Sequence, residues 1–426
     1  MDRRPLLALP PKQSFGTVPP AQTYGYGTTQ GASSARGSPE QHRRNSLLAE
    51  VPEEVGFADT DIEEEELELE LEERGYYIGS YKRKVALYSL VPISSIFVFV
   101  ILAVAPSLIW RPDQPSPPAH TRSFSSPLPE LLVTIALWSL SYLLRMPIYN
   151  LASAVFPIPL LQSLLFNTVY VLLSQLLRLS AVPILHIRYE MQYPLPTWRD
   201  PAFHRVWWVA LGWALADVTV GIAQGYEQLA LYRDAMVPEA HARDVLMRWR
   251  YAYEGAQTRR SQISPDEALR MSPRSLHENE DLDGTRKSEA ALRLAVDQDF
   301  EQLVRLKDRE ELEDIYGIPP IKIPVFVSCL QRLDAFVLSL GMTLIVSAAY
   351  LRAPLAFPDG KSLPPIYTNS ALAAAFPLII VVHLVLALLH TPPVLARVGV
   401  HTTAYVGLLV GLGSVFTGLG LWGALS

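Results

Sequence analysis

Cysteine is almost absent from this chain of 426 residues, in which Cys329 is the single one. One cysteine excludes an intramolecular disulfide framework. The sequence also has no Asn-x-Ser/Thr sequon for N-glycosylation. We therefore expect the part of the protein exposed outside the cytosol to be small.

Several catalytic and nucleotide-binding motifs are missing as well. The chain has no Walker A loop, no Gly-x-Ser-x-Gly, no His-Glu-x-x-His and no Cys/His cluster with metal-ligand spacing. The missing Walker A loop argues against a pump that hydrolyses ATP. The missing hydrolase and metal-binding motifs make an enzyme the less favoured class. Because these motifs are missing, we predict no cofactor and no metal. Basic residues are mixed with acidic ones and are not interleaved with aromatic ones, so we also predict no nucleic-acid partner.

Charged residues are scarce, at 18% of the chain, whereas 50% of the residues are hydrophobic. A soluble protein usually has about 25% charged residues. Seven apolar segments are each close to the roughly 20 residues that cross a bilayer as a helix. The predicted fold class is an all-α, polytopic integral membrane helix bundle with a disordered N-terminal tail. The predicted spans are Val85–Ile109, Leu131–Leu151, Ile158–Leu177, Val206–Tyr232, Pro324–Tyr350, Ala371–Leu389 and Gly399–Ala424.

The remaining charge is concentrated in residues 1–84 and 233–323. The first region is rich in Pro, Gly and Ser and ends in an acidic tract, Asp61–Tyr77, which we expect to be disordered and solvated. The second is predicted to contain helices at 235–253 and 285–316. The later helix carries an apolar stripe through Val296, Phe300 and Leu303. The stripe favours packing on the cytosolic ends of the spans, with a partner-binding helix as the alternative. Spans then occupy 85–232 and 324–426.

Lysine and arginine in the loops predict the orientation. Residues 233–323 hold about fifteen of them, and Lys82, Arg83 and Lys84 directly precede the first span. With seven spans, both regions lie on the same side. We therefore expect a cytosolic N-terminus and a C-terminus on the opposite side of the membrane.

The first residues, MDRRPLL, resemble an acidic dileucine sorting signal through Asp2, Leu6 and Leu7. Signals of this class are recognised by clathrin-adaptor complexes, which implies a vacuolar or lysosomal membrane. Another endomembrane or the plasma membrane is the alternative. Separate patterns around three serines resemble kinase sites. These serines are Ser46, Ser264 and Ser272.

Carboxyl groups inside two predicted spans point to function, because a charge at mid-bilayer costs about 2.5–3.5 kcal/mol or more. Asp217 lies roughly 16 Å into the fourth span, at a rise of 1.5 Å per residue. Gln224 follows seven residues later on nearly the same face. Gly221 and Gly225 lie close by and allow a neighbouring helix to approach.

The fifth span carries Arg332 and Asp334, which are two residues apart and therefore point to opposite faces. Their partners must come from other helices. Arg145 in the second span is one candidate partner for Asp334 or Asp217, and His383 in the sixth span lies at a similar depth. In the last span, Gly407-x-x-x-Gly411 favours close packing within the bundle, with homodimerisation as the alternative.

Two interpretations of these polar groups remain open. In the first, Asp217, Gln224, Asp334, Arg332, Arg145 and His383 line the path of a proton-coupled secondary transporter for an unidentified small solute. In the second, they fasten helices together in a non-transporting scaffold or trafficking regulator that acts through its tail and loop. A membrane-embedded enzyme or a receptor is the third, less favoured class. The bilayer is the one partner that every interpretation shares.

Overall fold

A computed structural model of the protein describes residues 58–109, 127–155, 158–262, 282–357 and 367–425. The sorting pattern and the three candidate phosphorylation sites lie outside these residues, so they remain predictions. The residues concerned are Asp2, Leu6, Leu7, Ser46, Ser264 and Ser272.

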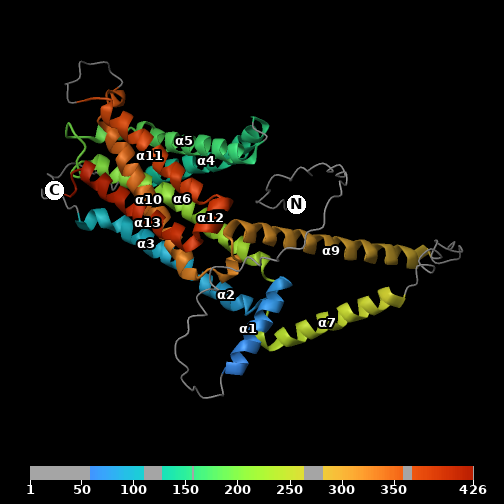
Figure 1. The fold of residues 1–426 in the computed structure, drawn as a ribbon. Coiled ribbons are helices and arrows are strands. Elements are labelled where there is room, and N and C mark those ends of the chain that lie inside the picture. Colours follow the sequence, from blue (N-terminus) through green and yellow to red (C-terminus); the bar gives the residue numbers. More distant parts are fainter. Residues whose placement is uncertain (1–57, 110–126, 156–157, 263–281, 358–366, 426) are drawn as a thin grey trace, which may run out of the picture. The chain divides into compact units, whose positions relative to one another are not determined.

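Seven helices are long and apolar enough to cross a membrane. The predicted fold class is confirmed: the chain is an all-α, multi-pass membrane protein (Figure 1). α2 (Tyr81–Tyr88) and α3 (Leu90–Ile109) together form the first span. The other six are α4 (Leu128–Val155), α5 (Pro159–Ile184), α6 (Pro201–Leu231), α10 (Val325–Leu351), α11 (Ser370–Leu389) and α13 (Val400–Leu421).

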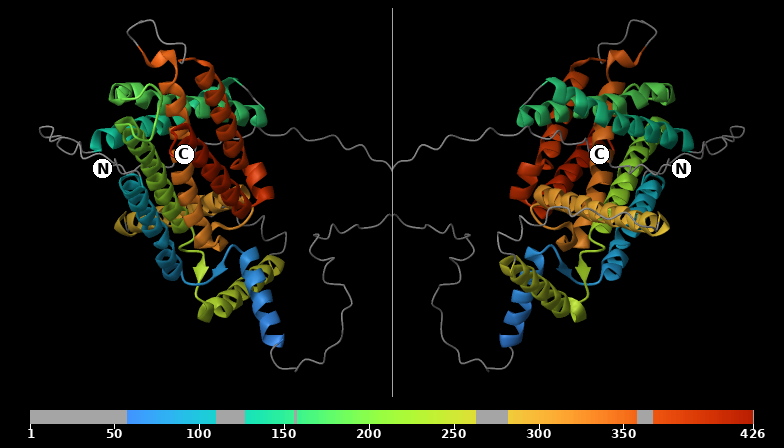
Figure 2. Two further views of the ribbon diagram at one scale, coloured as in Figure 1. Left: turned by 90° about the vertical axis from the view of Figure 1, so that its left-hand side faces the viewer. Right: turned by 90° about the vertical axis from the view of Figure 1, so that its right-hand side faces the viewer.

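α10 is the central helix of the bundle. It packs against α13, α6, α11 and α3, while α4 packs against both α5 and α6. In α6 and α10, more than half of the residues in the most apolar part of the helix are buried. In each of the other spans this share is less than a quarter. In Figures 1 and 2, α10 (orange) accordingly runs beside α6 (yellow-green) and α13 (red). α6 and α10 therefore form the most buried part of the bundle.

Glycines bring α10 and α13 into close contact. A Cβ at Gly411 would lie 3.1 Å from the backbone nitrogen of Leu338, and a Cβ at Gly341 would overlap Ser414. Small residues permit this approach because no side chain separates the two backbones. The prediction that Gly407-x-x-x-Gly411 serves packing within the bundle is confirmed.

Shorter elements connect or flank the spans. They are α1 (Ala58–Glu73), β1 (Tyr77–Ile78), η2 (Ile187–Glu190), β2 (Met236–Val237), α7 (Glu239–Gln262), α9 (Leu282–Tyr316), η3 (Pro320–Lys322), η4 (Pro354–Ala356) and α12 (Pro392–Val398). The strands β1 and β2 form a two-residue parallel bridge that joins the segment before the first span to the segment after α6.

The prediction that residues 1–84 are disordered is wrong for residues 58–84, which form α1, β1 and the start of α2. Glu and Leu are both strong helix formers. Leu67 and Leu71 are four residues apart and share one helix face, although the sequence alternates. Leu71 is buried against Ala242 and Leu246 of α7. Packing against α7 thus gives the acidic tract an apolar contact that its own sequence pattern did not reveal.

The helix predicted at 285–316 is confirmed as α9, which ends at Tyr316 before Gly317, a residue in the left-handed region at φ 71°. Its apolar stripe does not pack on the ends of the spans, which was the favoured prediction. Val296, Phe300 and Leu303 are 58–66% exposed. α9 instead contacts α12, α6 and η3. The sequence predicted the stripe correctly but not the absence of a partner for it within the described residues.

Candidate functional site

The two charged residues of α10 contact different neighbouring helices. The guanidinium of Arg332 lies where a Cβ of Gly221 in α6 would be, and the carboxylate of Asp334 lies where a Cβ of Gly407 in α13 would be. Each charge is therefore accommodated by a glycine on the opposing helix. The structure places the two side chains on opposite faces of α10, as their spacing predicts.

Asp334 lines a cavity of about 570 Å³, which we call the Asp334 cavity. Three of the predicted residues meet here, because α4 contributes Arg145, α10 contributes Asp334 and α11 contributes His383. α5 adds Asn167 and Tyr170. The cavity thus combines a carboxylate, a guanidinium and an imidazole from separate spans. Its wall also includes apolar side chains, namely Phe166, Val171, Leu338 and Leu386.

His383 is held by Gln175 of α5, whose amide nitrogen lies 2.5 Å from the imidazole Nδ1. If the amide donates, Nδ1 accepts and the ring proton is on Nε2. Gln175 is completely buried. This contact fixes the orientation of the imidazole ring at the edge of the cavity.

Asp217 of α6 has more than one polar neighbour. The side chain of Trp138 donates a hydrogen bond to it, and the guanidinium groups of Arg332 and Arg178 attract it. Asp217 in turn repels Asp334 electrostatically. The Asp217 side chain is exposed on the surface of the bundle and does not line the Asp334 cavity. The two carboxylates thus belong to one electrostatic network rather than to unrelated helix contacts.

The predicted partner Arg145 lines the Asp334 cavity with Asp334, whereas Asp217 is attracted by Arg332 and Arg178. Arg178 was missed because the third span was predicted to end at Leu177. The apolar residues that continue to Ile184 were the available signal, since α5 extends to that residue. Arg178 is 5% exposed and lies 4.7 Å above the ring of Trp213. Its Nη1 donates to the backbone oxygen of Ser339 at 3.5 Å.

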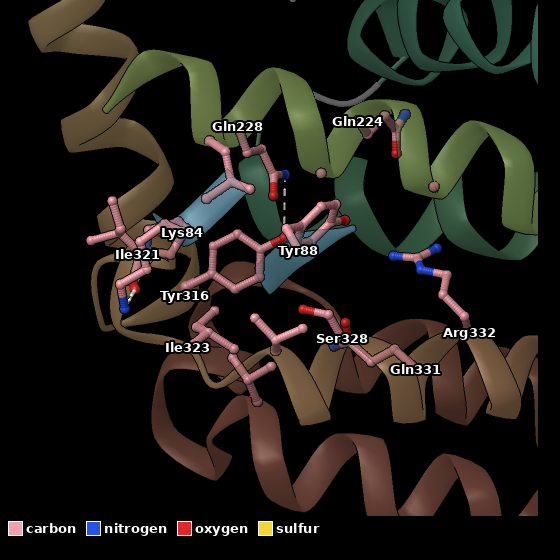
Figure 3. A pocket seen from close by; sticks show the side chains of 16 residues that line it. Lys84, Tyr88, Gln224, Gln228, Tyr316, Ile321, Ile323, Ser328, Gln331 and Arg332 are labelled. Atoms are coloured by element: carbon pink, nitrogen blue, oxygen red, sulfur yellow. Dashed lines mark hydrogen bonds between the residues drawn. The ribbon is translucent and has the colours of Figure 1, made fainter. Parts of the chain in front are cut away.

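A second, smaller cavity of about 110 Å³ lies on the Arg332 side of α10, and we call it the Arg332 cavity (Figure 3). Its wall includes Lys84 and Tyr88 from α2, Gln224 from α6 and Tyr316 from α9. Gln224, a predicted site residue, donates to the hydroxyl of Tyr142 at 3.3 Å. Gln224 therefore belongs to the Arg332 side of the network and does not line the Asp334 cavity.

Both cavities lie towards the end of the bundle where α9 is attached. Pro392 of α12 lines the Asp334 cavity, and Tyr316 of α9 lines the Arg332 cavity. α12 and α9 are in contact. Chemically, the carboxylates can exchange protons, and the guanidinium and ammonium groups can bind anions.

Among the described residues there is no group of three or more His, Cys, Asp or Glu side chains that could hold a metal ion. A scan against models of protein families gives no match. Searches of curated proteins and of solved structures likewise give no match to this chain.

Proposed function

We propose that this multi-pass membrane protein is a secondary transporter that couples the movement of a small polar solute to the movement of protons. The observation that supports this function is the Asp334 cavity, in which α4, α5, α10 and α11 bring Arg145, Asp334 and His383 to one space. Ionisable groups inside a membrane bundle characteristically mark substrate and proton paths. The volume of the Asp334 cavity, about 570 Å³, is within the usual range for small-molecule sites.

Asp334 is the residue we assign to proton exchange. Its Oδ1 is buried and has no hydrogen-bond partner among the described residues. Uptake of a proton by this carboxylate removes its repulsion with Asp217 and changes the charge of the cavity by one unit. If the proton binds more tightly in one conformation than in the other, protonation of Asp334 shifts the equilibrium between the two conformations. A transporter that works by alternating access requires such a shift.

The test is transport by purified protein in proteoliposomes loaded with a pH-sensitive dye. A panel of amino acids, sugars and small carboxylates is added, and proton flux is recorded for each compound. We expect Asp334→Asn to lower the flux at least about tenfold, equivalent to about 1.4 kcal/mol. Asp244→Asn is the matched control, since Asp244 is exposed on α7 outside the spans. Equal fluxes in the wild-type protein and Asp334→Asn would refute the role of Asp334.

The exposed apolar stripe of α9 favours a second function, that of a membrane scaffold. Phe300 and Leu303 are 66% and 62% exposed, which is unusual for large apolar side chains at helical spacing. In that case Phe300→Ser with Leu303→Ser removes a bound partner, whereas Asp334→Asn changes nothing. A transporter gives the opposite pattern in the flux assay.

For the location, we propose the vacuolar or lysosomal membrane with the N-terminal region in the cytosol. Asp2, Leu6 and Leu7 support clathrin-adaptor recognition, and Lys82, Arg83 and Lys84 support the orientation. Leu6→Ala combined with Leu7→Ala should move a tagged protein to the cell surface. Retention of that variant in the vacuole or lysosome would exclude these leucines as the signal.

A further inference from the structure

The wall of the Arg332 cavity carries positive charge without a carboxylate. Among its sixteen lining residues, Lys84 and Arg332 are basic and none is Asp or Glu. Lys84 uses one proton to donate to the backbone oxygen of Ile321 at 3.1 Å. An ammonium group has three protons to donate. The cavity therefore presents two cations from α2 and α10.

Arg332 keeps donors available on the cavity side. Its Nε is buried and has no hydrogen-bond partner among the described residues. Asp217 attracts the guanidinium from one turn deeper in α6, but Arg178 and Trp138 act on the same carboxylate. Asp217 is therefore shared between two arginines and does not neutralise both.

Neutral donors line the cavity between these two cations. Figure 3 shows Tyr88, Gln224, Ser328 and Gln331 on the same side of α10 as Arg332. Gln228 donates to the hydroxyl of Tyr316 at 3.3 Å and closes the other end of the cavity. Hydroxyl and amide groups can donate to an oxygen-rich ligand.

Two glycines of α6 create the room for this arrangement. A Cβ at Gly221 would overlap the guanidinium of Arg332, and a Cβ at Gly225 would overlap the hydroxyl of Tyr88. The glycines lie four residues apart and share one helix face. That face accepts two polar side chains where close packing of apolar helices would otherwise be expected.

The volume limits the ligand. A water molecule in the liquid takes about 30 Å³, so about 110 Å³ holds a group of the size of a few waters. Phosphate, sulfate and a short carboxylate are of that size, whereas a whole nucleotide is much larger. Arginine binds such oxyanions through its planar fork, and lysine binds them as a point charge.

We propose that the Arg332 cavity binds one small oxyanion, a phosphate, sulfate or carboxylate group, supplied by a free solute or by a lipid headgroup. The ligand contacts the guanidinium of Arg332 at the inner end. Lys84 lies at the opposite end of the cavity near η3 and attracts the anion electrostatically without contacting it (Figure 3). This site is separate from the Asp334 cavity and does not depend on transport.

Equilibrium binding to the purified full-length protein tests this site. Radiolabelled phosphate, sulfate and acetate are each titrated against protein in nanodiscs of phosphatidylcholine. We expect saturable binding of at least one anion, weakened at least tenfold in Arg332→Gln. Lys84→Gln, which alters a side chain nearer to the aqueous end, should weaken it too. Lys82→Gln is the matched control because Lys82 is exposed and does not line the cavity.

The source of the anion is distinguished by a second set of nanodiscs that contain phosphatidylinositol phosphate. Binding of this lipid, lost in Arg332→Gln and kept in Lys82→Gln, assigns the site to a headgroup. The site is refuted if no free anion and no anionic lipid binds saturably. It is also refuted if Arg332→Gln, Lys84→Gln and Lys82→Gln all bind the anion equally well. Asp334→Asn should bind the anion normally, so failure of transport and failure of this site give different results.

Discussion

Glycine residues decide where the charged side chains of α10 can lie. Gly221 of α6 makes room for Arg332, and Gly407 of α13 makes room for Asp334. A helical glycine is unfavourable by about 1 kcal/mol relative to alanine. At these two positions the absence of a Cβ is what allows a charged group to contact the neighbouring backbone.

Gly407→Ala is predicted to lower the free energy of unfolding by about 1–3 kcal/mol, because the added Cβ overlaps the Asp334 carboxylate. Gly413→Ala in the same helix is the matched control, since a Cβ there meets nothing within 4 Å. Helix propensity alone would stabilise both variants. Thermal unfolding in detergent compares them, and equal unfolding temperatures would show that Asp334 moves aside without cost.

A buried ion pair joins α4 to α6 at the opposite end of α6 from α9. Arg205 Nε donates to Glu130 Oε1 at 2.6 Å, and the Glu130 side chain is 4% exposed. Removing one partner of a buried pair leaves an uncompensated charge. Arg205→Ala should therefore destabilise the protein by about 3 kcal/mol, at the low end of the range for buried pairs, because Arg205 itself is 27% exposed.

The double variant Arg205→Ala with Glu130→Gln should recover a large part of that loss, since the buried carboxylate is then gone. Chemical or thermal unfolding of the single and double variants gives the comparison. A double variant that is less stable than Arg205→Ala would mean that Glu130 has another essential partner.

At the scale of elements, the end of α9 is fastened to two other segments. Glu313 Oε1 accepts hydrogen bonds from the hydroxyls of Tyr77 in β1, at 2.7 Å, and Tyr232 after α6, at 2.9 Å. Arg309 donates to the backbone oxygen of Gly75 at 3.1 Å. These contacts tie the segment before the first span to the loop between α6 and α10. A rearrangement that opens this end of the bundle must break them.

These contacts should weaken at high pH. Burial, followed by the hydrogen bond to Glu313, raises the pKa of Tyr77 and of Tyr232 well above the usual value near 10. The unfolded chain then releases these protons first as pH rises. The stabilisation is fully present below about pH 10 and declines as pH increases above it.

Thermal unfolding measured from about pH 8 to about pH 11 tests whether stability declines in this direction as pH rises. The variant Tyr77→Phe with Tyr232→Phe should be less stable at the lower pH but should lose less stability as pH rises. Tyr251→Phe is the control, because Tyr251 is 72% exposed. Identical pH dependence in all three proteins would exclude the two buried phenols as its source.

At the scale of the whole molecule, seven spans place the residues before α2 and those before α11 on opposite sides of the membrane. The single cysteine makes this testable, since Cys329→Ala gives a cysteine-free background. Ser80, Glu239 and Asn369 are all exposed. A membrane-impermeant maleimide should label Ser80→Cys and Glu239→Cys from one side and Asn369→Cys from the other. Labelling of all three from one side would contradict the number of spans.

Several features follow from sequence alone because they are local. Apolar length determines which segments cross a bilayer, since lipid offers the backbone no hydrogen bonds. The end of α9 at Tyr316 follows from Gly317 and the prolines after it. The opposite directions of Arg332 and Asp334 follow from helical geometry. Each of these depends on residues that are neighbours in the chain.

Only the tertiary structure decided which polar groups meet. The rotation and tilt of each helix are set by packing against other helices, and hydropathy does not encode them. That is why Arg178 rather than Arg145 acts on Asp217, why Arg145 and His383 share a cavity with Asp334, and why α1 folds against α7. The sequence determined a seven-span bundle with charges in its spans. The folded chain determined that Arg332 and Asp334 line separate cavities on opposite faces of α10, whereas Asp217 and Arg178 line neither.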